Sequence, residues 1–221
     1  DYGDISTWQT YTFPGFNQYQ KEDGSFLFQA YTISYPQPAQ ISKLISHTKP
    51  QQQNLEIKLN NLKLNINTGI ELPGICTFSD SHFEDAENLI NIVNYQNFRE
   101  LNISSSLESA QLDSWRLAVP TQENFQRMPQ LVVCQKKNND QYYRRNTDIG
   151  AISLELPTQF SSEQVLNRPE LDPIFNILNS IKIFKPTEPL PVPAPSPDPL
   201  TETFKNEYYP YQISYPKDWR F

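Results

Sequence analysis

The amino-acid sequence predicts an α+β domain, a central antiparallel sheet flanked by helices. Apolar and polar residues alternate along most of the chain, which is typical of strands, whereas one segment near residue 175 has apolar residues at helical spacing. A chain of 221 residues with 37% hydrophobic residues is long enough to bury one sizeable core. We expect residues 1–185 to form this domain.

The first elements are a strand and a weak helix. The phrase YTISYP at residues 31–36 has the alternation of a strand, and PAQISKLISHT favours a short helix near residues 38–47. The next two strands flank Asn60-Asn61, in NLEIKLN and LKLNI, and their apolar phase flips across the two asparagines. Such a flip is what a tight turn or a bulge produces.

Four further strands and a hairpin turn follow. The turn is expected at KKNNDQ, residues 136–141, between polar flanks. The strands are expected in the segments NLINIVNYQNFREL, DSWRLAVP, QLVVCQKK and GAISLELP.

The domain closes with the stronger of the two helices, around residues 171–182. Asp172 and Pro173 are suited to its N-cap and its first turn. An apolar stripe at helical spacing is expected to pack on the sheet, and it consists of Leu171, Ile174, Phe175, Leu178 and Ile181.

Residues 186–200 are expected to be a linker. The segment PTEPLPVPAPSPDPL has proline at nearly every second position, and each proline fixes φ and removes a backbone donor. It is therefore predicted to be a stiff polyproline-type spacer. A PxxP match within it arises automatically in such a run, so a spacer is favoured over a peptide ligand.

The end of the chain repeats a phrase from its beginning. YQISYP at residues 211–216 matches YTISYP at residues 31–36 in five of six positions, and TETFKNEYY at residues 201–209 echoes TWQTYTF at residues 7–13. The two phrases lie a whole domain apart, which is too far for a solenoid repeat. Residues 201–221 are therefore predicted to be the incomplete start of a second, similar domain.

These phrases, with FNILNSIKIF at residues 175–184 and YQISYPKDW at residues 211–219, resemble the PsbP-like domains of bacterial envelope proteins and lipoproteins. The resemblance implies an antiparallel sheet between helices and an extracytoplasmic location, and it transfers no catalytic residue. One departure is YPQPAQI in the first copy, where the family has a YP.DW pattern.

The charge and hydropathy of the chain limit the kinds of molecule to which it is expected to bind. A net charge of −7 disfavours non-specific binding to nucleic acid or anionic membranes. No stretch approaches the roughly 20 apolar residues of a membrane span, and the chain begins at Asp1, which indicates processing or a longer parent chain. The only basic concentration, Lys136, Lys137, Arg144 and Arg145, is interpreted as the solvated face of a hairpin.

Cys76 and Cys134 lie 58 positions apart in apolar, strand-like runs. Two alternatives stay open: a pair of buried thiols, or, if the protein is exported, a disulfide between neighbouring strands.

The densest polar cluster is SDSHFEDAE, residues 79–87. Asp80, His82 and Glu84 share a face if the segment is a strand, which makes them weak candidates for a metal site. An acidic loop or a capped helical turn is favoured instead, because metal ligands normally come from more than one segment. Neighbouring strand residues point to opposite faces, so a catalytic arrangement of Ser79 or Ser81 with His82 is weaker still.

We therefore predict a non-enzymatic extracytoplasmic module that presents a surface to a partner protein or to the cell envelope, without a cofactor. The alternative is a metal-dependent or hydrolase-like activity around Asp80, His82 and Glu84.

Overall fold

The structure is a computed structural model, and the chain divides into two compact units, Asp1–Thr187 and Glu188–Phe221. The residues that it describes are 4–15, 28–45, 53–68, 74–80, 92–107, 114–137, 141–145, 147–158, 160–162, 164–185, 202–205 and 212–215.

The predicted α+β class is wrong, because the protein is mostly β, with 51% strand and 16% helix, and five of its strands close into a barrel. The α-helices of the described residues are α1 (Gln122–Arg127) and α2 (Asp172–Asn179). Three short 3₁₀ segments accompany them, at Ile5–Thr7, Val165–Asn167 and Pro169–Leu171. Among the described residues, these helices are too few and too short to form the helical layers expected on either side of a sheet.

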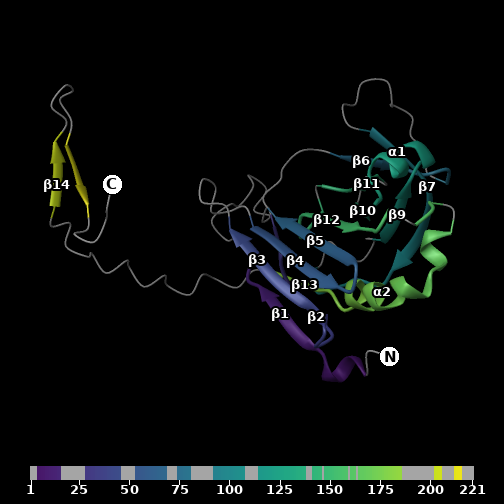
Figure 1. Cartoon of the computed structure of the whole chain (residues 1–221), viewed down its shortest axis with the longest axis horizontal. Helices are drawn as coiled ribbons and strands as arrows, with labels where there is room; N and C mark the ends of the chain where they lie inside the picture. The colour runs from purple at the N-terminus through teal and green to yellow at the C-terminus, as the bar shows by residue number, and fades with distance from the viewer. Residues whose placement is uncertain are drawn as a thin grey trace. The chain divides into compact units, whose positions relative to one another are not determined.

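The barrel strands follow one another in the order β11-β6-β7-β9-β10, and a pairing between β10 and β11 closes the ring (Figure 1). β6 and β7 are parallel, and the other four pairs are antiparallel. The bounds are Ile75–Thr77 for β6, Ile92–Leu101 for β7, Trp115–Pro120 for β9, Gln130–Lys136 for β10 and Tyr142–Tyr143 for β11.

β10 is the branch point of this sheet. Its first residues, Gln130–Val132, pair with β12 (Ala151–Glu155), and Gln135 and Lys136 pair with β11 on the far side of the expected KKNNDQ turn. The sheet continues from β12 through β5 (Leu62–Thr68) and β4 (Gln53–Leu59) to β3 (Gln40–Ile45).

The two strands expected around Asn60-Asn61 are β4 and β5. Leu59 pairs with Leu62, so the two asparagines alone form the loop, and Asn60 has φ 54°. Two-residue hairpin loops favour asparagine because the chain must enter the left-handed region. The phase flip therefore marks a tight turn.

The weak helix predicted near residues 38–47 is wrong, since Gln40–Ile45 form β3 at the end of the sheet. All six residues pair with β4, and all six are exposed. Pairing along the edge of an existing sheet outweighs the local helical spacing.

A second, four-stranded sheet has the order β1-β2-β13-β8. It contains β1 (Gln9–Phe13), β2 (Ala30–Tyr35), β13 (Lys182–Phe184) and β8 (Ser104–Ser105). α2 precedes β13, and Ser180 at its end ties it to this sheet: the Ser180 hydroxyl donates to the Ser34 carbonyl at 3.1 Å and accepts from the Ser34 N–H at 2.8 Å.

The burial of the predicted apolar stripe is confirmed, although Leu171 and Ile181 lie just outside α2. The five members of the stripe are buried, with at most 2% of their surface exposed. The expected N-cap is wrong, since Leu171 is the N-cap and Asp172 lies with Pro173 in the first turn. The helix ends at Asn179, and β13 occupies the end of the expected range 171–182.

The first unit has two cores. The larger contains the α2 stripe, Phe13, Tyr31 and Ile33 of the second sheet, and apolar residues of β4, β5, β9, β10 and β12. The smaller, which we call the barrel core, consists of Cys76, Phe78, Tyr95, Ala118, Cys134 and Tyr142. β9 contributes Leu117 to one core and Ala118 to the other, which explains why its residues are buried on both faces.

In the second unit β14 (Glu202–Lys205) and β15 (Gln212–Tyr215) form an antiparallel pair. Glu202 pairs with Tyr215, and at the matching positions of the first copy Gln9 of β1 pairs with Tyr35 of β2. The matched phrases therefore form hairpins with the same register.

Candidate functional site

Arg116 is the charged residue enclosed at the barrel core. It lies on β9, where its cross-strand partners are Glu100 on β7 and Cys134 on β10. Ala118, two residues along the same strand, belongs to the barrel core, and strand alternation places Arg116 on the same face. Its side chain is 11% exposed.

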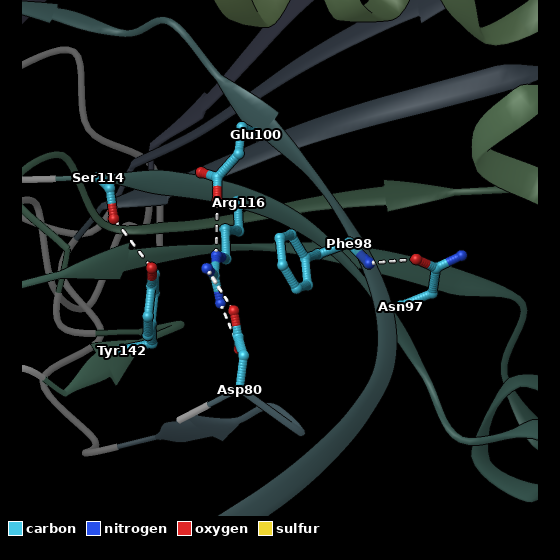
Figure 2. A network of polar contacts seen from close by, with 7 residues as sticks. All are labelled: Asp80, Asn97, Phe98, Glu100, Ser114, Arg116 and Tyr142. Carbon is cyan, nitrogen blue, oxygen red and sulfur yellow. Dashed lines mark hydrogen bonds and ion pairs between the residues drawn. The ribbon is translucent and has the colours of Figure 1, made fainter. Parts of the chain in front are cut away.

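Two carboxylates neutralise the guanidinium (Figure 2). Nη1 and Nη2 of Arg116 each donate to one carboxylate oxygen of Asp80 at 2.9 Å, and Nε donates to Glu100 Oε1 at 2.9 Å. The hydrogen bonds from Arg116 lower the pKa of Asp80 below its ordinary value. Bidentate, charge-assisted pairs of this kind are among the stronger hydrogen bonds in proteins.

Three aromatic rings surround the same guanidinium. Its Cζ lies 3.7 Å from the ring centroid of Phe98, 4.5 Å from that of Tyr142 and 4.9 Å from that of Phe78. The rings of Phe78 and Tyr142 meet edge to face, and the Tyr142 hydroxyl shares a hydrogen bond of 2.9 Å with the Ser114 hydroxyl. Such rings stabilise a cation by their quadrupoles.

A disulfide joins Cys76 and Cys134 through the barrel core. The strands that it joins, β6 and β10, are not hydrogen-bonded neighbours, because β11 pairs with both and lies between them. The bond therefore crosses the barrel. In the sequence analysis a disulfide was considered only between neighbouring strands. The Cys76–Cys134 bond ties the short strand β6 covalently to the branch point of the sheet.

A second polar cluster fixes the segment before β12 to β10. The buried amide of Gln135 donates to Asp148 Oδ2 at 2.6 Å and accepts from the Asp148 N–H at 2.8 Å, and Lys137 pairs with Asp148 Oδ1 at 3.2 Å. These groups satisfy one another, so the cluster is structural.

Of the three candidate metal residues, Asp80 is described and His82 and Glu84 lie outside the described residues. Both Asp80 oxygens accept from Arg116, so a metal ion would compete with a bidentate guanidinium for the same carboxylate. Among the residues that the structure describes, no three His, Cys, Asp or Glu side chains come together as a metal-binding group.

Sequence reasoning missed Arg116. The segment DSWRLAVP was interpreted only as a strand, although an arginine inside a short apolar run is the signal that could have drawn attention to it. Its two carboxylates are 36 and 16 positions away, so only the folded barrel brings the cluster together.

Comparisons of the chain with protein-family models, with curated proteins and with solved structures found no match. The resemblance to PsbP-like domains stays a prediction. In the described part of the chain no helix is long and apolar enough to cross a membrane.

Proposed function

We propose that this chain is a non-catalytic, extracytoplasmic module that binds a partner protein and is followed, behind a proline-rich spacer, by a second unit of the same kind. The observation that carries the proposal is the repeated hairpin. β14 and β15 reproduce the register of β1 and β2 at all four of their pairs. Repetition of one domain along a chain is typical of proteins that space several binding surfaces.

The burial pattern of β2 supports this interpretation of the repeat. Tyr31, Ile33 and Tyr35 face the large core with 1%, 0% and 7% of their surface exposed. The repeated phrase has Tyr211, Ile213 and Tyr215 at the matching positions. A second domain with the same packing would explain why these letters recur.

The disulfide supports the extracytoplasmic location. Disulfides persist in oxidising compartments and are rare where thioredoxin and glutathione keep thiols reduced. The Cys76–Cys134 bond in the barrel core would persist in such a compartment and stabilise the barrel there. The partner is proposed to be a protein or another envelope component.

The pairing within the Arg116 cluster supports a non-catalytic role. Each nitrogen of the guanidinium donates to a carboxylate of its own chain, and the aromatic rings cover its faces. Three of its five N–H groups are held by carboxylates of the same chain and its faces are covered by rings, an arrangement that favours a role in stabilising the barrel.

Two measurements on protein isolated from its own cells test the proposal. Thiol trapping before lysis should find both cysteines oxidised, and metal analysis with and without prior chelation should find no stoichiometric metal. Free thiols in freshly trapped cells would contradict the location. Stoichiometric zinc or calcium would instead favour the metal-dependent alternative around Asp80, His82 and Glu84.

A further inference from the structure

The last strand of the nine-stranded sheet has an open edge. β3 pairs with β4 over six positions on one side, and on its other side it has no strand neighbour among the described residues. All six β3 residues are exposed. An edge strand presents unpaired N–H and C=O groups that can pair with another strand.

This edge is also apolar. Ile41, Leu44 and Ile45 are 36%, 63% and 49% exposed, and Met128 is the other large exposed hydrophobic residue of the described part of the chain. Three of these four residues therefore lie on one strand. Such a concentration on an open edge is typical of an interaction site.

The side chains of β3 alternate in a definite order. Ile41 pairs with Ile57, and Lys43 pairs with Leu55, so both lie on the face of the sheet that carries the large core. Ile45 follows on the same face by strand alternation. Along this face the side chains of β3 are therefore apolar, basic and apolar in turn.

Lys43 has no ion-pair partner among the residues described, unlike Lys58 and Lys63, which both pair with Glu56. β3 contains no acidic residue. A second copy of β3 would therefore bring no carboxylate to Lys43, and a symmetric register centred on Lys43 would place two lysines opposite each other. Like charges directly opposite are destabilising.

We infer that the edge of β3 binds an extended strand of a partner protein that carries an acidic residue opposite Lys43, with apolar residues on either side opposite Ile41 and Ile45. Backbone hydrogen bonds extend the sheet by one strand, and the alternating side chains supply the selectivity. The inference rests on the proposed binding role, and it names the chemistry of the partner.

Two synthetic peptides test the inference on the full chain. Acetyl-TVTETVT-amide has the expected pattern, and acetyl-TVTKTVT-amide differs only in the sign of its central charge. In a titration of ¹⁵N-labelled protein, the acidic peptide should shift the amide signals of residues 40–45. It should bind about two- to fivefold more tightly than the basic peptide, the range expected for one opposite-charge cross-strand pair.

Three variants make the test specific. Lys43→Glu should reverse the preference between the peptides, and Leu44→Pro should abolish binding of both, because the proline breaks the pairing of β3 with β4 and so disturbs the edge. Lys182→Glu is the matched control, since it changes an exposed lysine of β13 by the same charge and should keep the wild-type preference.

Absence of peptide binding would overturn the inference. Amide shifts that spare residues 40–45 would do so too, as would a preference for the acidic peptide that Lys43→Glu leaves unchanged. Sedimentation that shows a dimer abolished by Leu44→Pro would identify a second copy as the occupant and would also overturn it. None of these outcomes bears on the thiol and metal measurements, so the two proposals fail separately.

Discussion

At the scale of single residues, Arg116 combines packing and charge. Its guanidinium contacts three rings and two carboxylates, and those carboxylates are far more exposed than the arginine, with side-chain exposures of 48% for Asp80 and 54% for Glu100 against 11%. Removal of the arginine would let the carboxylates return to water but would leave the rings without their cation. The stability lost on replacing Arg116 should therefore come chiefly from its contacts with the aromatic rings and from its bidentate hydrogen bonds.

Arg116→Lys should lower the free energy of unfolding by about 1–3 kcal/mol, because lysine keeps the charge but loses the bidentate fork and the stacking on Phe98. Urea unfolding measures the change. Arg127→Lys is the control, since Arg127 is 74% exposed in its ion pair with Glu123 and should change the free energy by less than about 0.5 kcal/mol. Equal losses in the two variants would refute a special role for Arg116.

Asp80 should make stability depend on pH. Hydrogen bonds from Arg116 lower its folded-state pKa, so it stabilises the fold above its unfolded value of about 3.9. This contribution is lost as the pH falls through the lowered folded-state value. Asp80→Asn should therefore be less stable than wild type at pH 7, and the two proteins should converge near pH 2. A difference in urea midpoint that stays constant over this range would show that Asp80 acts only through packing.

At the scale of elements, α2 attaches the second sheet to the large core. Phe175 is 2% exposed, and the guanidinium carbon of Arg99 lies 3.6 Å from the centroid of its ring. Arg99 also pairs with Asp172 at 3.5 Å, so this side chain spans the first turn of the helix. The apolar stripe and this arginine together fix α2 against β7.

Phe175→Ala should cost about 3–5 kcal/mol of the free energy of unfolding, because it leaves a cavity in the large core. Asn176→Ala is the matched control on the exposed face of the same helix and should be nearly neutral. Thermal or urea unfolding of both variants decides the matter. An unfolding curve that Phe175→Ala leaves unchanged would show that this ring does not contribute to the core.

The disulfide should stabilise the barrel by about 2–4 kcal/mol, since it closes a sequence separation of 58 residues in the unfolded chain. The double variant Cys76→Ala and Cys134→Ala should lose stability by that amount. The wild-type protein, unfolded without reductant, should react with no thiol reagent. Two reactive thiols in that experiment would show that the bond does not form.

At the scale of the whole molecule, both cores lie within the unit Asp1–Thr187. A chain that ends after Thr187 should therefore unfold at the same urea midpoint as the full chain. A broad-specificity protease should first cut after residue 185 and leave this unit intact. A lower midpoint for the shortened chain would show that residues 188–221 belong to the first domain and would contradict the tandem arrangement.

The loop at Asn60-Asn61 and α2 could be predicted because their signals are local. Asn60-Asn61 specifies its turn by backbone conformation, and the spacing of Ile174, Phe175 and Leu178 needs only one face of a helix. β3 could not be predicted in this way. Ile41, Leu44 and Ile45 fit a helical spacing, and only the presence of β4 beside them makes a strand more favourable.

By itself, the sequence determined most of the strands, the closing helix and the repeated phrase, because each depends on residues close together in the chain. The spacer predicted at residues 186–200 lies outside the described residues and stays a prediction. Only the tertiary structure decided that the sheet closes into a barrel, that Cys76 and Cys134 bond across it, and that Arg116 meets Asp80 and Glu100. These outcomes depend on pairings between distant segments, such as β10 with β11 and β12 on the same side. Periodicity shows which residues are buried, but it does not show which strand lies beside which.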